Sequence, residues 1–411
     1  MRALRGPAPF LGSNALAISP GARNLYVASS KSNTIVIFKR NPRSGTLSQR
    51  SGAGGCIAAN GAAGCATALG LDHPNSVAVS PDGNNVYATS LASNTVAIFS
   101  RDPSTGALTQ ATDGSGCVAN AATFGCATGR ALEGPDVVTV SPDGKNVYVG
   151  SFIGNAVAVF ARDPSTGALT QPTGASGCLA NTPTEGCATG FALAAPEGMA
   201  ISDDGNNVYV ATAVSNALVV LRRDPSTGAL IQATDGTGCI VDAELTGCTT
   251  GTQLGGANAV AVSPDDRDVY VTSLLSNSLT SFTRTATTGQ LTQQTGTSAC
   301  VIYVLAVGCS LGRALSAPEG VAVSPDGASV YTAAFDSNAL GVFDRDTDSG
   351  ALIQKSGRAG CLTTSKVPDC RRARALLQVS SVIVSPDGRY LYSAAFASNA
   401  VGVFKRVTHG R

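Results

Sequence analysis

Seven positions spaced 61 residues apart carry polar side chains, and six of the seven are carboxylates or amides. In order they are Asn14, Asn75, Asp136, Glu197, Asn258, Glu319 and Ser380. Side-chain oxygens of Asp, Glu and Asn are the ligands that a hard cation such as Ca²⁺ prefers. If these residues converge, the six from Asn14 to Glu319 are candidate Ca²⁺ ligands. The same side chains could instead cap turns and face water, in which case no cofactor is required.

Acid–base chemistry would draw on a smaller set of residues. Glu197 and Glu319 both stand in a Pro-Glu-Gly sequence, and His73 immediately precedes Pro74-Asn75. Glu and His are the side chains that most often transfer protons in catalysis, so these three are the candidate catalytic residues. A lone histidine is also common as a surface or packing residue. No nucleophile motif or Gly-rich phosphate loop accompanies them.

Three arginines recur at one position of the repeat and are candidates for substrate binding. They are Arg130, Arg313 and Arg374. A guanidinium group binds carboxylate or phosphate through two parallel hydrogen bonds, so this position would suit an anionic substrate.

The twelve cysteines form six pairs with C-x8-C spacing. The pairs are Cys56 with Cys65, Cys117 with Cys126, Cys178 with Cys187, Cys239 with Cys248, Cys300 with Cys309, and Cys361 with Cys370. Structural zinc sites favour closer spacing and four ligands, so six local disulfides are the better interpretation. Each would stabilise its loop by about 2–3 kcal/mol. Disulfides persist in oxidising compartments, which predicts an extracytoplasmic or secreted protein.

A repeat of 61 residues must position all of these groups. Its marks, a Ser-x-Asp-Gly turn followed by Asn-Val-Tyr, recur from Ser80, Ser141 and Ser202, and the register extends over the whole chain. Alternating apolar runs separated by Pro, Gly and Asn predict four antiparallel strands per repeat. Radially repeated four-stranded units are the blades of a β-propeller, and their core forms between neighbours.

Counting strands predicts seven blades in one domain. The inner strand recurs seven times and the outer Leu-x-Gln strand six times, so the last blade lacks its outer strand. We therefore expect an all-β, seven-bladed propeller over residues 1–411, with units starting near residues 14, 75, 136, 197, 258, 319 and 380. The first twenty residues show no signal peptide. A longer natural precursor would explain both the missing strand and a missing export signal.

These repeats resemble the YVTN-type repeats of the lactonase-like propeller superfamily, which includes 6-phosphogluconolactonase and carboxymuconate cyclase. The Ser-Pro-Asp-Gly-x-x-Val-Tyr-Val and Ser-Asn-x-Val-x-Val-Phe patterns carry the resemblance over nearly the whole chain. The resemblance implies a propeller fold, and it permits a Ca²⁺ ion at the channel mouth and lactone hydrolysis. Each repeat departs from the family pattern by an insertion of about twenty residues, in which the cysteines lie.

Composition excludes several classes of partner. The net charge is +1 with 13% charged residues, and the basic residues form no polybasic stripe. Nucleic acid is therefore not expected as a partner. No apolar run is long enough to span a membrane. We expect a monomer that binds a small molecule, a saccharide or a protein at its channel mouth.

Two functions are compatible with these observations. The near identity of the repeats favours an exported binding or scaffold propeller, with the disulfide loops forming a collar around the channel mouth. The alternative is a lactonase-like hydrolase of a sugar or carboxylic acid lactone, for which the asymmetric acids and His73 would supply the chemistry.

Overall fold

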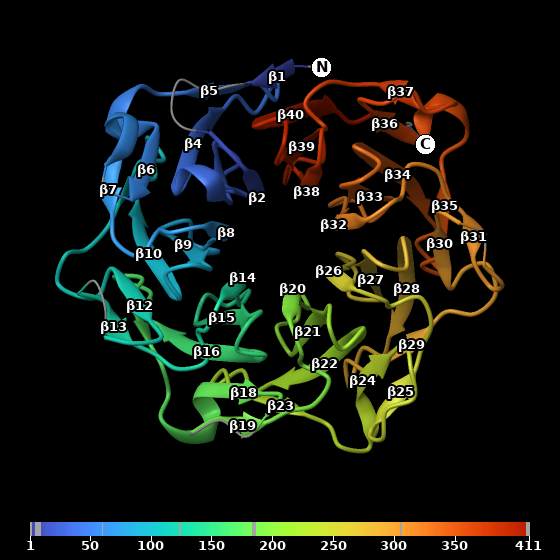
Figure 1. Cartoon of the computed structure of the whole chain (residues 1–411), viewed down its shortest axis with the longest axis horizontal. Helices are drawn as coiled ribbons and strands as arrows, with labels where there is room; N and C mark the ends of the chain where they lie inside the picture. The colour runs from blue at the N-terminus through green and yellow to red at the C-terminus, as the bar shows by residue number, and fades with distance from the viewer. Residues whose placement is uncertain are drawn as a thin grey trace.

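The computed structural model describes residues 2–4, 10–59, 61–122, 125–182, 186–304 and 306–407. Seven β-sheets are arranged radially around a central channel, with the first and last sheets side by side (Figure 1). The predicted all-β, seven-bladed propeller is confirmed. The helices of the described residues are short 3-10 turns, and none has the length or hydrophobicity to cross a bilayer. They are η1 (Ser30–Ser32), η2 (Gly52–Gly54), η3 (Ala62–Gly64), η4 (Gly174–Gly177) and η5 (Gly357–Ala359).

Every blade contains three antiparallel strands, which follow one another outward from the channel. The inner strands are β2 (Ser13–Ile18), β8 (Pro74–Val79), β14 (Pro135–Val140), β20 (Pro196–Ile201), β26 (Ala257–Val262), β32 (Pro318–Val323) and β38 (Val379–Val384). The second strands are β3 (Asn24–Ser29), β9 (Asn85–Ser90), β15 (Asn146–Ser151), β21 (Asn207–Thr212), β27 (Asp268–Ser273), β33 (Ser329–Ala334) and β39 (Tyr390–Ala395). The third strands are β4 (Thr34–Arg40), β10 (Thr95–Arg101), β16 (Ala156–Arg162), β22 (Ala217–Arg223), β28 (Ser278–Arg284), β34 (Ala339–Arg345) and β40 (Ala400–Lys405).

The fourth, outer position of the first six blades is divided between two short strands. Both pair antiparallel with the third strand: Leu-x-Gln segments pair with its end, and segments that contain the first cysteine of each pair lie against its beginning. The Leu-x-Gln strands are β5 (Leu47–Gln49), β11 (Leu108–Thr109), β17 (Leu169–Thr170), β23 (Leu230–Gln232), β29 (Leu291–Gln293) and β35 (Leu352–Gln354). The cysteine strands are β6 (Cys56–Ala59), β12 (Cys117–Ala119), β18 (Cys178–Ala180), β24 (Gly236–Val241), β30 (Cys300–Ile302) and β36 (Cys361–Thr363).

The inserted loops add one more strand to each of these blades. It pairs in parallel with the cysteine strand and forms the edge of the sheet farthest from the channel. These edge strands are β7 (Ala66–Ala68), β13 (Ala127–Thr128), β19 (Ala188–Thr189), β25 (Cys248–Thr250), β31 (Ser310–Leu311) and β37 (Arg371–Arg372).

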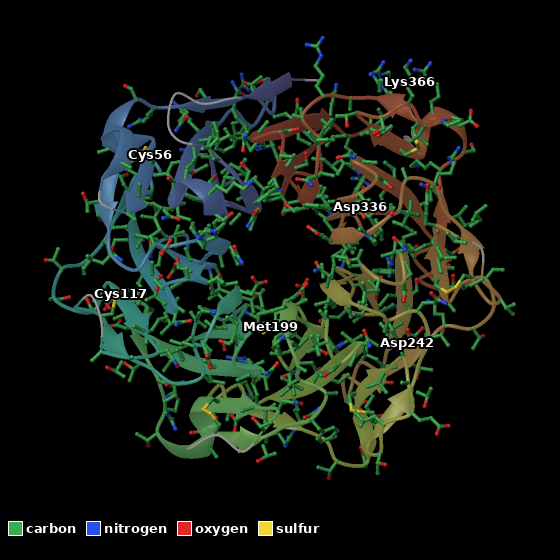
Figure 2. All side chains as sticks on the ribbon, viewed as in Figure 1. Cys56, Cys117, Met199, Asp242, Asp336 and Lys366 are labelled. Carbon is green, nitrogen blue, oxygen red and sulfur yellow. A yellow bond between two sulfur atoms is a disulfide. The ribbon has the colours of Figure 1, made fainter. Side chains whose placement is uncertain are left out.

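All six predicted disulfides are present, and each joins two cysteines nine positions apart. Their position corrects one expectation. The loops that they close lie at the outer edge of the blades, where Figure 2 shows Cys56 and Cys117 near the circumference. They therefore do not form a collar around the channel mouth. The reason is that each inserted loop folds back along the third strand of its own blade and extends the sheet outward.

The seventh blade takes three strands from its own repeat, as predicted. Its outer position is filled from the other end of the chain, because β1 (Arg2–Leu4) pairs antiparallel with β40. Arg2 lies opposite Val403 and Leu4 opposite Val401. In the other blades, cysteine strands pair with this same first part of the third strand. The two ends of the chain thus close the ring within one sheet.

The apolar core lies between blades, not within them. One cluster joins Tyr148 and Val157 of the third blade to Val208 and Val219 of the fourth, and the other junctions have equivalent clusters. Second strands are buried along their whole length, and their central Val-Tyr-Val sequences are consistent with burial on both faces. Neither face of a blade is covered until its neighbours fold against it.

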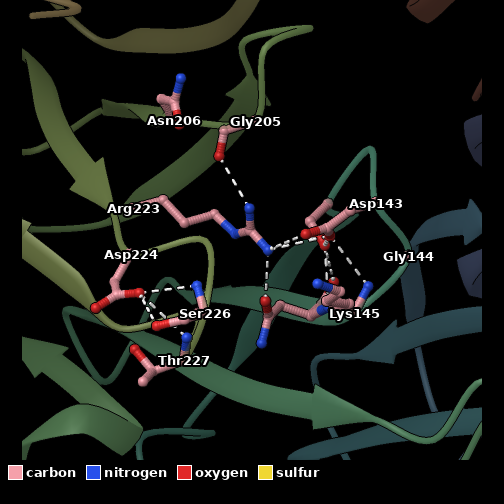
Figure 3. A network of polar contacts seen from close by, with 12 residues as sticks. Asp143, Gly144, Lys145, Gly205, Asn206, Arg223, Asp224, Ser226 and Thr227 are labelled. Atoms are coloured by element: carbon pink, nitrogen blue, oxygen red, sulfur yellow. Dashed lines mark hydrogen bonds and ion pairs between the residues drawn. The ribbon is translucent and has the colours of Figure 1, made fainter.

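An arginine at the end of each third strand, or just after it in the seventh blade, joins two blades, and it is buried in every blade except the second. Arg223 donates from Nε to the Tyr148 hydroxyl at 2.8 Å and from Nη2 to both carboxylate oxygens of Asp143, all in the preceding blade. Its Nη1 donates to the Gly205 carbonyl of its own blade at 3.0 Å. Figure 3 shows the guanidinium group between Asp143 and Gly205. Only 1% of the Arg223 side chain is exposed, so its guanidinium group has no access to water. Each of these partners replaces a hydrogen bond that the group would otherwise make to water.

Replacing Arg223 with Ala should lower the free energy of unfolding by roughly 2–3 kcal/mol, because it strands the buried Tyr148 hydroxyl and leaves Asp143 without its cation. Urea unfolding at neutral pH measures the change. Arg222→Ala is the matched control, since Arg222 is the exposed neighbour on the same strand, and its effect should stay below about 0.5 kcal/mol. Equal effects of the two substitutions would contradict the structural role of the buried arginine.

Candidate functional site

A cavity of about 450 Å³ opens at the mouth of the channel, and all seven ring residues predicted from the 61-residue spacing line it. The ring consists of Asn14, Asn75, Asp136, Glu197, Asn258, Glu319 and Ser380. Each comes from the beginning of one inner strand, so each blade contributes one polar side chain. Phe335 and Phe396 add two aromatic walls.

An irregularity of the sheet sets the direction of the ring side chains. The register of the inner strand shifts at every ring residue, so that Asp136 and Glu197, for example, have no partner in the second strand. The same shift occurs at the other five ring positions. A residue bulged out of a ladder is free to point along a new direction, and such bulges are frequent next to binding sites.

The recurring asparagine of the turn between second and third strands holds the segment that enters the next blade. Asn94 has a left-handed backbone, with φ of 54°, and its side-chain oxygen accepts a hydrogen bond from the Gly134 N–H at 2.7 Å. Asn155 binds the Ala195 N–H in the same way at 2.8 Å. Gly134 and Ala195 lie two residues before Asp136 and Glu197. The same turn geometry, repeated from blade to blade, therefore positions the acids of the neighbouring blade.

Hydrogen bonds link several ring residues across blade boundaries. Asn14 donates from Nδ2 to Asn75 at 3.1 Å, and Asn75 donates to Asp136 at 2.6 Å. Asn258 donates from Nδ2 to Glu197. Glu319 receives no such hydrogen bond from a described residue. The ring thus contains two amide-to-acid chains, the Ser380 hydroxyl, which donates to the Asn14 carbonyl at 3.0 Å, and one acid that accepts no hydrogen bond from a described side chain.

The three acids of the ring hold their protons more strongly than usual. Burial and, to a lesser degree, the nearby charges of Asp136 and Glu319 together raise the pKa of Glu197 to about 8, against the opposing hydrogen bond from Asn258. The pKa of Glu319 is raised to about 7 by burial and by Asp336 and Asp136. Burial raises that of Asp136 to about 6. Near neutral pH, the cavity therefore contains carboxyl groups in both protonation states, which acid–base chemistry requires.

The rim beside the acids contains two charged side chains. The Lys31 ammonium lies 4.1 Å from the centre of the Phe396 ring, and Asp336 follows the lining residue Phe335. Figure 2 shows Asp336 beside the channel. Phe335 and Phe396 occupy one position of the repeat, and several other blades have Leu or Ala at that position. The sequence pattern therefore did not single them out.

Three of the six predicted Ca²⁺ ligands are amides, Asn14, Asn75 and Asn258. In the part of the chain that the structure describes, no three His, Cys, Asp or Glu side chains are grouped so that they could hold a metal ion. Amide N–H groups of Asn75 and Asn258 already donate to Asp136 and Glu197, where a cation would need the oxygens. Ca²⁺ on this ring stays a prediction, and no chemical step below depends on it.

His73 lies near the mouth but does not line the cavity. Its backbone has a left-handed φ of 54°, and its N–H donates to the side chain of Asn33 at 3.0 Å. The imidazole is about half exposed, with Nδ1 3.6 Å from Asp72. The geometry therefore favours Glu197 and Glu319 over His73 among the three predicted catalytic residues.

The three predicted substrate-binding arginines are not brought to the cavity. Arg130 donates to the carbonyls of Pro172, Gly174 and Gly186 in the outer loop of the next blade. Arg313 makes the equivalent bonds to Lys355 and Gly357. Arg374 is exposed. The contacts of Arg130 and Arg313 favour a role in joining neighbouring blades at the outer edge over the predicted binding of an anionic substrate.

Comparison with known proteins identifies one family. The sequence model of the family described as "Lactonase, 7-bladed beta-propeller" matches residues 122–239 and 240–367, which is more than half of the chain. No curated protein sequence matches it.

Solved structures share the fold at low sequence identity. Hydrazine synthase of Kuenenia stuttgartiensis is 17% identical with a TM-score of 0.60, over 98% of this chain and 97% of its own. A putative 6-phosphogluconolactonase from Bacteroides fragilis is 18% identical with a TM-score of 0.58, over 83% and 82%. The periplasmic gluconolactonase PpgL of Pseudomonas aeruginosa is 22% identical with a TM-score of 0.56, over 83% of each chain. At such identities the likeness shows the fold alone.

The raised pKa of Glu197 predicts a pH dependence of stability. Because the folded chain holds this proton more tightly than the unfolded chain does, the stabilisation is complete below the unfolded value of 4.5 and is lost as the pH rises through about 8. Glu197→Gln cannot ionise, so at pH 9 its melting temperature should exceed that of the parent by about two degrees, with little difference at pH 5. Glu133→Gln changes an exposed carboxylate and should leave the profile unaltered. If the melting temperatures of Glu197→Gln and the parent changed with pH in parallel, the raised pKa of Glu197 would be refuted.

Proposed function

The chain belongs to the family of seven-bladed β-propeller lactonases, and on that premise we propose that it hydrolyses lactones in the cavity at the channel mouth. The observation that carries the proposal is the convergence of Asp136, Glu197 and Glu319 on one cavity, with pKa values of about 6, 8 and 7. Carboxyl groups tuned to neutral pH are the means by which general acids and bases work in enzymes.

The proposed reaction divides the two proton transfers between Glu197 and Glu319. Glu319, which has the lower pKa of the two and no hydrogen bond from a described residue, accepts a proton from the attacking water. The water oxygen bonds to the lactone carbonyl carbon, and the bond between that carbon and the ring oxygen then breaks. Glu197, held by Asn258, is the protonated group that gives its proton to the departing ring oxygen. The product is the open hydroxy acid.

The lining of the cavity favours an uncharged lactone as substrate. None of the described residues that line it is Lys, Arg or His, whereas three are acids. A phosphate or carboxylate on the substrate would therefore meet like charge, and no cation among the described lining residues compensates it. Such like-charge pairs are repulsive at close range. Amide and hydroxyl groups of Asn14, Asn75 and Ser380 can instead bind the hydroxyl groups of a sugar lactone.

The alternative of an exported binding or scaffold propeller has less support. The disulfide collar that it relied on does not surround the mouth, and the family match points to lactone chemistry. The expected location is independent of this choice. Six disulfides within short loops are typical of proteins in oxidising compartments, and we propose an extracytoplasmic location for the enzyme.

Glu197→Gln and Glu319→Gln should each lower kcat/KM for a plain sugar lactone such as glucono-δ-lactone by about 100-fold or more, because each removes one proton transfer. A pH-stat that follows acid release measures the rates. Glu133→Gln and His73→Ala are the controls, and both should stay within about threefold of the parent. Full activity in both cavity variants would remove the acids from the mechanism, and a large loss in His73→Ala would restore that residue to it.

Chelation tests the role of a metal. Because the ring acids accept hydrogen bonds from amides and hold protons near neutral pH, turnover of the sugar lactone should be the same with EDTA as with added Ca²⁺. The measurement is the initial rate after dialysis against EDTA, followed by addition of millimolar CaCl₂. Loss of activity on chelation with recovery on addition of Ca²⁺ would establish the ring as a metal site and displace the metal-free mechanism.

A further inference from the structure

The nearly neutral chain separates its charges along the sequence. Residues 1–71 contain eight Lys and Arg and no Asp or Glu, and residues 352–411 contain ten Lys and Arg and two Asp. The segment between them, residues 72–351, contains ten Lys and Arg against 25 Asp and Glu. The sequence therefore has two basic ends and an acidic middle.

The propeller brings the two basic ends together. The described part of residues 1–71 forms β1 and the first blade, and the described part of residues 352–411 forms the outer part of the sixth blade and the seventh blade. Arg40 of the first blade donates to Tyr392 of the seventh at 2.6 Å, and β1 pairs with β40 (Figure 1). We call these two segments together the basic sector. It occupies one side of the disc, and the acidic middle of the chain occupies the rest.

Most positive charges of the basic sector are available to a partner. Among its described residues, twelve Lys and Arg side chains are exposed, and none of the twelve forms an ion pair with a described Asp or Glu. The ion-paired bases Arg40, Lys355 and Arg406 are buried or partly buried. A surface with this many unneutralised cations attracts polyanions and releases counterions when one binds.

Six of the twelve exposed cations lie on two surfaces of the disc. The first is the face that contains the turns between inner and second strands, where Arg43, Arg389 and Lys405 line a cavity of about 640 Å³. Two acids, Asp326 and Asp387, also line it, and each is paired with a buried arginine. Arg43 and Arg389 belong to turns of different blades, the first and the seventh. This cavity therefore spans the junction at which the ring closes.

The second surface is the outer edge of the sixth blade. Arg371 and Arg372 form the exposed edge strand β37, and Lys366 lies in the disulfide-closed loop before it. Figure 2 shows Lys366 at the circumference. The equivalent loops of the other blades contain few bases; residues 111–130, for example, contain one arginine and one aspartate. The disulfide between Cys361 and Cys370 holds this basic loop against its blade.

We propose that the basic sector binds an acidic polysaccharide, a flexible chain whose carboxylate groups follow the cations from the turn face around to the outer edge. A flat membrane surface would contact only one of the two surfaces. Single-stranded nucleic acid gains much of its affinity by stacking bases on exposed aromatic rings. The described aromatic side chains of the sector are buried, except Phe396 at the channel mouth.

Binding of soluble alginate, a polymer of carboxylated sugars, tests the proposal. The probe should bind the full chain at 50 mM NaCl and bind more weakly at 200 mM, since the contacts are ionic. The triple variant Lys366→Gln/Arg371→Gln/Arg372→Gln should lose about tenfold in affinity, and so should Arg43→Gln/Arg389→Gln/Lys405→Gln, because each removes three exposed contacts. Calorimetric titration gives the dissociation constants, and thermal unfolding verifies that each variant is folded.

The matched control is Lys145→Gln/Arg222→Gln/Arg267→Gln. These three exposed bases lie outside the basic sector, so the variant makes the same change in net charge and should bind alginate within about twofold of the parent. No binding of alginate at 50 mM NaCl, or equal losses in all three variants, would overturn the proposal. It would also be overturned by tighter binding to phosphatidylglycerol vesicles or to single-stranded DNA than to alginate. A loss confined to one of the two sector variants would refute the continuous path between the surfaces.

Discussion

Every blade depends on an arginine at or just after the end of its third strand, which lies where two blades meet and is buried in six of the seven blades. Its guanidinium group donates to a tyrosine hydroxyl of the preceding blade. It also donates to a backbone carbonyl in the turn between the inner and second strands of its own blade. Burying this charge is costly unless each donor finds an acceptor. Satisfying all of them at once fixes how far one blade is rotated from the next. The apolar surfaces hold the blades together, whereas the hydrogen bonds of the arginine fix the orientation of one blade relative to the next.

The acceptors of this arginine vary around the ring, and the variation shows which contacts matter. Arg162 pairs with Asp82 of the Ser-Pro-Asp-Gly turn in the preceding blade. The first blade has Gly21 at the equivalent position, and Arg101 of the second blade keeps only the other two side-chain contacts of this type, to Asn24 and to the Tyr26 hydroxyl, among the described residues. The tyrosine is therefore the constant partner, and the aspartate adds charge compensation where it is present. A repeat can lose its acid and still hold its neighbour.

The rigid spacing of the blades places the ring residues near one another in spite of their electrostatic repulsion. Each inner strand bulges at its ring residue, and the asparagine turn of the preceding blade holds the entering segment. Asp136, Glu197 and Glu319 are consequently confined to one cavity, where burial raises all three pKa values and the charge of Asp136 also raises those of Glu197 and Glu319. The same closure that concentrates acids at the mouth also juxtaposes the basic ends of the chain at the rim. A chain of almost zero net charge thus presents an acidic cavity and a basic outer sector.

The repeat alone determined the number of blades, the inner three strands of each blade, the cysteine pairing and the identity of the ring residues, because all of these recur with a period of 61 residues. Local patterns predict such features whenever each copy repeats the same turn and strand chemistry. The direction of the cysteine loops was not predictable, since a loop of small residues carries no signal for the edge against which it packs. Arg130 and Arg313 likewise share a position in the sequence, but only the packing of the next blade shows that their partners are backbone carbonyls. Tertiary structure also decided the protonation of the acids and the union of the basic ends, because both depend on distances between residues that are far apart in the chain.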